Sequence, residues 1–184
     1  MDRDWSGIDR ELWDTQWHLL CHRSEVGSAS QFVAFTICGQ EVVAFHDGAS
    51  VVVFDNRCPH RGTRIFDGTH GQQRFLCRYH GWSYAKGRLF VTERGSFGDC
   101  DPTQATLNSY QIGWLGDFLF VSRRPAQSLA EQLTGIEAPL EAISRSIAIR
   151  ADHNTYVYEC NWKIAVENAL DQYHVAIIQT TEQW

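Results

Sequence analysis

The sequence lacks the features that place a protein in a membrane or send it through one. No uninterrupted run of apolar residues is longer than four, as in residues 51–54 and 175–178, whereas a membrane-spanning helix needs about 20. The first seven residues are mostly polar, with no apolar stretch behind them, and do not resemble a secretory signal. We therefore expect a cytoplasmic protein with no membrane partner.

An excess of basic residues is also missing. Lysine and arginine total 16 against 22 aspartate and glutamate residues, so the net charge is −6. This balance argues against a protein that binds nucleic acid through a basic surface. Apolar residues make up 43% of the 184 residues, enough for a folded core, and the length suits one domain plus the start of another.

Disulfide bonds are not expected among the six cysteines, because a reducing cytoplasm disfavours them. Metal binding then becomes the leading interpretation for cysteines close to a histidine in a recognisable pattern. The other cysteines are expected to be small, buried apolar side chains. They are Cys21, Cys38, Cys100 and Cys160.

The chain up to about residue 124 has the composition of β-structure. Apolar residues near helical spacing predict a short helix over residues 11–20 that leads into a strand. Beyond it, β-branched and aromatic residues separated by glycine turns predict strands and hairpins. These fall within residues 31–45, 51–54, 74–77, 81–90 and 112–121.

The composition changes after residue 124. Apolar residues at spacings of three and four, interrupted by Gly135 and Pro139, predict two short helices within residues 125–146. Residues 155–158 are strand-like, and Asn161 is a suitable cap for a helix over residues 162–174.

Three parts are predicted from these patterns. Residues 1–16 form an N-terminal helical segment, residues 17–124 a mainly β domain, and residues 125–184 the start of an α+β domain. The last part is too short to bury its apolar face alone.

Two short segments each contain a cysteine followed by a histidine. Cys58 is paired with His60, and Cys77 with His80, with 16 residues between the two pairs. A glycine follows each histidine closely, so both segments are predicted to be loops at the ends of adjacent hairpins that face each other across a metal.

This ligand set admits two kinds of metal site. Two thiolates and two imidazoles can hold a tetrahedral zinc ion, or a [2Fe-2S] cluster in which one iron takes both cysteines and the other both histidines. Zinc sites usually pair like ligands in each segment, whereas each segment here is mixed, as it must be if each loop is to touch both irons. The pattern favours the cluster, with a Cys2His2 zinc module as the alternative.

The two motifs, CPHRG at residues 58–62 and CRYHGW at residues 77–82, resemble the Rieske iron–sulfur domain. The resemblance implies a mainly β fold of antiparallel sheets with two cluster-binding hairpin loops. It makes Cys58, His60, Cys77 and His80 the ligands of a [2Fe-2S] cluster, with the histidine-bound iron near the surface. Neutral imidazoles raise the reduction potential relative to an all-cysteine cluster, so we expect a protein that accepts one electron.

Basic residues are concentrated around the two motifs. Residues 55–90 contain seven lysines and arginines against two acidic residues, Asp55 and Asp67. Such a patch can stabilise a reduced, anionic cluster or attract an acidic redox donor. Ordinary solvated arginines on hairpins are an equally good interpretation of any single one of them.

A second stretch resembles the large subunits of ring-hydroxylating oxygenases. Unlike respiratory Rieske proteins, the chain has no membrane anchor and no extra cysteine in each loop. In the oxygenases, the helix that matches residues 161–174 opens the catalytic domain. The resemblance makes His174 the first histidine ligand of a mononuclear iron, and Asp171 the residue that links this iron to the Rieske histidine of a neighbouring subunit.

Asp171 and His174 are three residues apart, so on a helix they share a face, where a carboxylate can orient an imidazole ligand. A helix with a solvated Asp–His pair is the alternative interpretation. The chain departs from the family at the second iron histidine, where it has Gln179, a weaker ligand. The third ligand, a carboxylate, has no counterpart before Trp184. We therefore expect mononuclear Fe(II) in the full-length family but not a complete site in these 184 residues.

The resemblance implies the N-terminal portion of an oxygenase large subunit, a dioxygenase or a monooxygenase of aromatic compound catabolism. Such a subunit accepts electrons from a ferredoxin or a flavin/iron–sulfur reductase and passes them to the mononuclear iron for O2-dependent hydroxylation. The resemblance also implies a homo-oligomer, namely a trimer, with or without a β subunit. The alternative function is a stand-alone Rieske electron carrier without oxygenase activity.

Overall fold

The computed structural model describes residues 7–37, 39–99, 101–102, 105–149 and 156–171. It divides into two compact units, Met1–Arg150 and Ala151–Trp184. The elements of the first unit are α1 (Gly7–Thr15), β1 (His18–His22), the 3₁₀ helix η1 (Arg23–Glu25), β2 (Gln31–Ile37), β3 (Gln40–His46), β4 (Val51–Asp55), β5 (His70–Gln72), β6 (Ser83–Ala85), β7 (Arg88–Phe90), the 3₁₀ helix η2 (Arg94–Phe97), β8 (Gln111–Leu115), β9 (Phe118–Ser122), α2 (Leu129–Gln132) and α3 (Glu137–Ser146). The second unit contains α4 (Trp162–Leu170).

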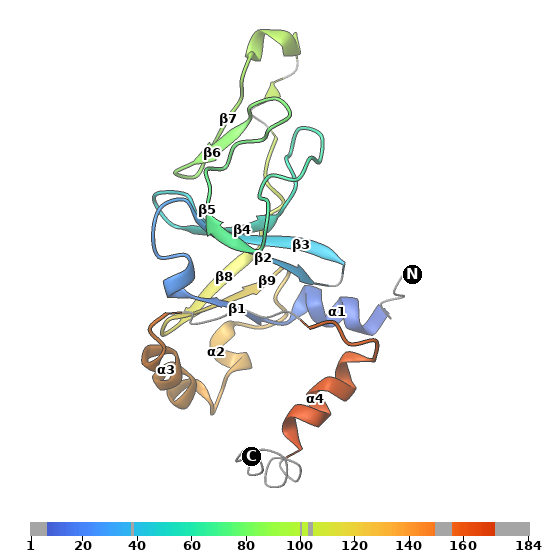
Figure 1. The fold of residues 1–184 in the computed structure, drawn as a ribbon, viewed down its shortest axis with the longest axis vertical. Coiled ribbons are helices and arrows are strands. Elements are labelled where there is room, and N and C mark those ends of the chain that lie inside the picture. Colours follow the sequence, from blue (N-terminus) through green and yellow to red (C-terminus); the bar gives the residue numbers. More distant parts are fainter. Residues whose placement is uncertain (1–6, 38, 100, 103–104, 150–155, 172–184) are drawn as a thin grey trace, which may run out of the picture. The chain divides into compact units, whose positions relative to one another are not determined.

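The strands of the first unit form two larger sheets and a separate hairpin. One sheet has the order β1-β9-β8, the other β4-β3-β2-β5, and β6 pairs with β7. All of these pairs are antiparallel, which confirms the predicted mainly β fold. Within this unit, the β6–β7 hairpin and η2 lie at the end opposite α2 and α3 (Figure 1).

Strands β2, β3 and β4 bury side chains on both faces of their sheet. Successive residues of each strand point to opposite faces and so enter different cores. Val42 and Ala44 of β3 pack into the inter-sheet core, which also contains residues of β1 and β9, such as Leu119. Val43 and Phe45 of β3 point to the opposite face, into a second core on the side of the ligand loops, the loop-side core. The loop-side core is rich in aromatic residues and also contains both candidate cysteine ligands and Trp82.

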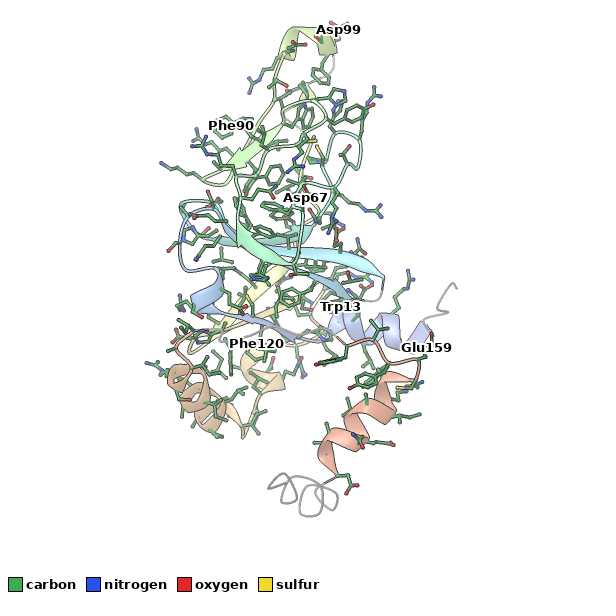
Figure 2. The ribbon with its side chains drawn as sticks, in the orientation of Figure 1. Trp13, Asp67, Phe90, Asp99, Phe120 and Glu159 are labelled. Atoms are coloured by element: carbon green, nitrogen blue, oxygen red, sulfur yellow. The ribbon has the colours of Figure 1, made fainter. Side chains whose placement is uncertain are left out.

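Helices α2 and α3 cover the outer face of the sheet of β1, β8 and β9. A third core lies on this side and contains Trp17, Phe118, Phe120 and Leu133, the residue that follows α2 (Phe120 is labelled in Figure 2). The predicted pair of short helices within residues 125–146 is thus confirmed. Pro139 does not interrupt α3, since it lies in the first turn, where a proline is tolerated. No helix among the described residues combines the length and the apolar character that a membrane crossing needs.

Several of the predicted elements are wrong in whole or in part. The helix predicted over residues 11–20 ends at Thr15, and Leu19 and Leu20 belong to β1. Residues 74–77 form only an isolated bridge, from Leu76 to Ser83, and residues 156–158 form no strand. The hairpins predicted within residues 31–45 and 81–90 are confirmed as β2–β3 and β6–β7.

Candidate metal centre

The first cysteine–histidine pair lies in a loop that follows the end of β4. The Cys58 N–H donates to the Thr63 carbonyl at 2.8 Å, and the Gly62 N–H donates to the Cys58 carbonyl at 2.8 Å. Gly62 has a φ of 71°, a left-handed conformation that glycine adopts without a steric penalty. The loop is therefore closed tightly around Cys58, whose side chain is buried.

The second loop has the same backbone frame. The Cys77 N–H donates to the Trp82 carbonyl at 2.8 Å, and the Gly81 N–H donates to the Cys77 carbonyl at 2.9 Å. Gly81 has a φ of 72°. In both loops the fourth residue after the cysteine donates and the fifth accepts, but the histidine is the second residue after Cys58 and the third after Cys77.

The two loops bring like side chains together. Cys58 and Cys77 are 3% and 2% exposed and belong to the same core. Burial raises the pKa of the Cys58 thiol, and the neighbouring Cys77 thiol adds to this, against the opposing effect of the His60 backbone N–H. The rings of His60 and His80 have centroids 4.6 Å apart. Burial lowers the pKa of His60, and the charges of His80 and Arg61 act in the same direction.

These residues fit a [2Fe-2S] cluster better than a single zinc ion. Within the described part of the chain, no three histidine, cysteine, aspartate or glutamate side chains converge closely enough to hold one metal ion. A structural zinc needs four ligands around one point, whereas a cluster takes two protein ligands on each of two irons. In addition, His60 Nδ1 is buried and has no hydrogen-bond partner among the described residues. Coordination to a metal would satisfy this buried nitrogen, which is otherwise costly to leave without a partner.

The imidazoles lie nearer to the surface than the thiols. His80 is exposed, and so is the adjacent Tyr79, whose ring centroid is 4.0 Å from that of His80. Beside the imidazoles is a groove of about 550 Å³. It is lined by His60, Arg61, His80, Trp82, Thr92, Glu93, Ser96 and Phe97.

Asn56 anchors the first loop, a role that the sequence analysis missed. Its buried amide is satisfied on all sides: Nδ2 donates to Glu41 Oε2 and to the Phe66 carbonyl, each at 2.9 Å. Oδ1 accepts from the N–H groups of Ile65 at 3.2 Å and Phe66 at 2.9 Å. Since Asn56 precedes the loop and residues 65–66 follow it, this one side chain closes the loop at its base.

Asp47 anchors the hairpin that follows the second loop, a role that no motif in the sequence indicated. Its carboxylate accepts from the N–H groups of Ala49 at 2.8 Å and Ser50 at 2.9 Å, within its own turn. It also accepts from the Gly87 N–H at 2.5 Å, in the β6–β7 turn. Burial acts to raise the pKa of Asp47, but these three donors and the charge of His46 outweigh it and hold the pKa below its ordinary value.

The basic patch predicted within residues 55–90 is partly neutralised by acidic partners. Arg78 pairs with Asp67 at 2.9 Å (Asp67 is labelled in Figure 2), and Arg64 pairs with Glu41 at 2.5 Å. Asp55 does not offset this patch directly, because it is buried and accepts a hydrogen bond from the Tyr110 hydroxyl at 2.6 Å.

The second unit contains the start of the other predicted site. Asn161 caps α4 as predicted, since its side chain accepts from the Lys163 N–H at 3.0 Å. The helix ends at Leu170, and Asp171 has an extended backbone at its C-cap. Asp171 is therefore not inside the helix, which corrects the predicted span of 162–174. His174 and Gln179 lie outside the described residues.

The prediction of buried cysteines without metal ligands holds only in part. Cys21 is buried in the inter-sheet core, as predicted, but Cys160 is exposed. The prediction is wrong for Cys160 because the residue lies in an irregular segment just before α4. Cys38 and Cys100 lie outside the described residues.

Comparison with protein families gives two matches. The family model described as the Rieske [2Fe-2S] domain matches residues 16–111, just over half of the chain. The model described as the ring hydroxylating alpha subunit (catalytic domain) matches residues 146–180. The four candidate cluster ligands fall in the first match, and Asp171 and His174 fall in the second.

Curated relatives are similar over nearly the whole chain. The large subunit of anthranilate 1,2-dioxygenase from Acinetobacter baylyi is 28% identical, over 91% of this chain and 38% of that protein. The oxygenase subunit of carnitine monooxygenase from Escherichia coli is 29% identical, over 86% of this chain and 44% of that protein. The chain thus spans about two fifths of the length of these relatives.

Solved structures share the fold. A quaternary ammonium Rieske monooxygenase in complex with an inhibitor has a TM-score of 0.80 at 21% identity, over 91% of this chain and 49% of that one. Naphthalene 1,2-dioxygenase with indole bound has a TM-score of 0.57 at 24% identity, over 66% of this chain and 29% of that one.

Proposed function

Because the chain belongs to the Rieske [2Fe-2S] domain family, we propose that Cys58 and Cys77 hold one iron of a [2Fe-2S] cluster and that His60 and His80 hold the other. The separation of these side chains into a buried thiol pair and an imidazole pair nearer the surface carries the proposal. This is the division that a cluster with two sulfur ligands on one iron and two nitrogen ligands on the other requires.

The residues around the site suit electron transfer. The bound cluster supplies one-electron chemistry, accepting and releasing a single electron. The loop-side core excludes water from the thiols, since both cysteines pack among its aromatic side chains. The imidazoles offer the route to the surface, because His80 is exposed beside the groove.

We further propose that this domain serves a ring-hydroxylating oxygenase large subunit, either a dioxygenase or a monooxygenase. The match over residues 146–180 and the oxygenase relatives support this assignment. In this proposal, residues 1–16 form the N-terminal helical segment, 17–124 the Rieske domain and 125–184 the start of the catalytic domain. Asp171 links the catalytic iron to the Rieske histidine of a neighbouring subunit, and His174 is an iron ligand.

The proposed partners are those of the family. A ferredoxin or a flavin/iron–sulfur reductase supplies electrons, and the oxygenase forms a homo-oligomer, namely a trimer, with or without a β subunit. The exposed arginines of the basic patch, such as Arg61, support an acidic electron donor. A cytoplasmic location agrees with this electron supply.

Metal and sulfide analysis of the purified 184-residue chain tests the cluster. We expect about two irons and two acid-labile sulfides per chain, and a paramagnetic resonance signal after dithionite reduction. Chains reconstituted with zinc serve as the control for adventitious binding. Zinc alone, with no sulfide and no signal, would contradict both the cluster and the oxygenase assignment.

Iron binding at the second site is tested at Gln179. We expect Gln179→His to raise the affinity of the chain for added Fe(II), measured by equilibrium dialysis, because imidazole is a better iron ligand than an amide oxygen. The double variant that also carries His174→Ala is the control and should lose this gain. Equal Fe(II) binding by the unmodified chain and the Gln179→His variant would refute the role of His174.

A further inference from the structure

Trp82 belongs to the second loop but contacts a candidate ligand of the first. Its ring is stacked on that of His60, with centroids 4.7 Å apart and only 9° between the planes. Trp82 is 2% exposed, so this contact is shielded from water. Among the described aromatic contacts, it is the most nearly parallel, and it crosses from one loop to the other.

Several contacts fix the indole in this position. The Trp82 carbonyl accepts from the Cys77 N–H at 2.8 Å, which ties its backbone to the ligand loop. Phe97 of η2 packs against both rings, with centroids 5.9 Å from Trp82 and 5.8 Å from His60. The backbone of the second loop and the ring of Phe97 thus help to hold the indole in place.

The imidazole of His60, by contrast, is held by its aromatic neighbours. Its Nδ1 makes no hydrogen bond within the described part of the chain, and the rings of Trp82, Phe97 and His80 surround it. No disulfide joins the two loops, because the cysteines in them, Cys58 and Cys77, are both free.

We propose that Trp82 is a positioning residue that holds the His60 imidazole in the orientation a metal ligand needs and thereby braces one ligand loop against the other. This inference rests on the proposed function, since it assumes that His60 is a cluster ligand. An aromatic pair contributes about 0.5–1.5 kcal/mol beyond the burial of its area. Loss of the stack is therefore expected to change the rate of cluster release by up to about tenfold.

Three variants of the cluster-loaded 184-residue chain test this bracing of His60 by Trp82. Trp82→Phe keeps a flat ring against His60, and Trp82→Leu removes the ring face while it keeps an apolar side chain. Trp17→Leu is the matched control, because Trp17 is also buried but lies in the core under α2, away from the loops. Two measurements are made on each: the rate at which a chelator bleaches the visible absorption, and the paramagnetic resonance spectrum of the reduced cluster.

We expect Trp82→Leu to release the cluster about tenfold faster and to show altered g-values, because a freed imidazole changes the iron environment. Trp82→Phe should stay within about twofold of the unmodified chain in release rate. Trp17→Leu should lower thermal stability and leave the g-values unchanged. The proposal is refuted if Trp82→Leu leaves both measurements unchanged, or if Trp17→Leu alters the g-values to the same extent.

If Trp82→Leu is isolated without a cluster, the test moves to Trp82→Met, which also removes the ring face but fills more of the space of the indole. A faster release with shifted g-values in this variant supports the brace, and an unchanged spectrum and rate refute it. Failure of the proposed function is distinguishable from failure of the brace. Without the proposed cluster, the unmodified chain contains no sulfide, whereas without the brace it has a normal cluster that Trp82 does not affect.

Discussion

The two ligand loops share one backbone frame but are anchored in different ways. Each has a cysteine whose carbonyl accepts from a left-handed glycine four residues later. The first loop is closed at its base by the amide of Asn56. The second has no such amide, and depends on the Thr92 hydroxyl, which donates to the His80 carbonyl at 2.5 Å, and on the β6–β7 hairpin that Asp47 holds.

A ligand motif therefore sets the local turn but not the position of that turn in the molecule. The motif residues account for the hydrogen bonds within each loop, whereas residues outside the motifs, Asn56 and Asp47, anchor the loops to the rest of the domain. The first loop depends on one buried side chain, so we expect a single substitution there to disrupt the loop. The second loop depends on several weaker contacts, so we expect each substitution there to destabilise it only in part.

Changing a ligand in each loop should produce the largest effects. We expect His60→Ala to reduce iron from about two per chain to near zero, because the cluster cannot be held by three ligands at a buried site. His80→Cys should keep the cluster but lower its reduction potential by on the order of 100 mV or more, since a thiolate adds negative charge. Metal analysis and redox titration measure these changes. An unchanged visible spectrum in both variants would contradict the ligand assignment.

Asn56→Ala should be the next largest effect, confined to the first loop. The substitution leaves buried N–H groups of Ile65 and Phe66 without their acceptor, and we expect it to destabilise the fold by about 3 kcal/mol. The shift of the urea midpoint of the cluster-loaded chain measures this. Arg64→Ala, which removes the surface partner of Glu41, is the control and should cost less than about 1 kcal/mol. Equal losses in the two variants would rule out Asn56 as the anchor.

Asp47→Asn should weaken the support of the second loop by about 2 kcal/mol at pH 7, because a carboxylate accepts hydrogen bonds more strongly than an amide oxygen. The pKa of Asp47 lies below its ordinary value in the folded chain. Its contribution is therefore complete above the ordinary value of about 3.9 and is lost as the pH falls through the lower folded value.

The stability difference between the unmodified chain and Asp47→Asn should thus be constant from about pH 7 to pH 5 and shrink below about pH 4. Urea unfolding across this pH range measures it. A difference that grows on acidification would have the wrong sign for a carboxylate with a lowered pKa.

The two loop glycines provide a smaller and more direct comparison. Both have φ near +70°, so alanine should cost about 1 kcal/mol at either position for the backbone conformation alone. At Gly81 an added Cβ would also approach Thr92 Cγ2 to 3.3 Å, whereas at Gly62 it would meet no described atom within 4 Å. We expect Gly81→Ala to shift the thermal midpoint more than Gly62→Ala. The reverse order would show that Thr92 does not support the second loop.

The smallest effect is expected at the ion pair between Arg78 and Asp67. Their side chains are 74% and 53% exposed, so solvent screens the pair, and Arg78→Ala should change stability by less than about 0.5 kcal/mol. Denaturation at low and high salt checks this. A larger loss that disappears at high salt would mean that this pair, rather than the aromatic contacts, joins the loops.

The parts of the fold that depend on neighbouring residues could be predicted from the sequence. The β6–β7 turn is an example, since Lys86 and Gly87 both have positive φ, which is the type of turn that closes a two-residue hairpin. The presence of one cysteine and one histidine in each loop could also be predicted, because the two residues are close together in the sequence. The fold class followed from the strand composition.

The contacts that depend on distant residues could not be predicted. Asp47 reaches Gly87, 40 residues away, and no local pattern indicates that contact. Trp13, Trp17 and Leu20 have helical spacing, but the Trp17 N–H donates to the Gln132 side chain, 115 residues away, where the helix has already ended. The predicted strand at residues 74–77 failed for a different, local reason, because the second loop folds back on itself after Leu76 and only the bridge to Ser83 forms.

The sheet of β2 to β5 separates two hydrophobic cores, and this limits the changes of sequence that the fold can accommodate. Odd and even positions of β3 belong to different cores, so a substitution at Val43 or Phe45 alters mainly the packing of the loop-side core, and one at Val42 or Ala44 mainly that of the inter-sheet core. A single-residue deletion within β3 would be more disruptive, because it would turn the side chains that follow it towards the opposite core. Compensating substitutions should therefore fall within one core at a time, while insertions and deletions should be confined to the turns.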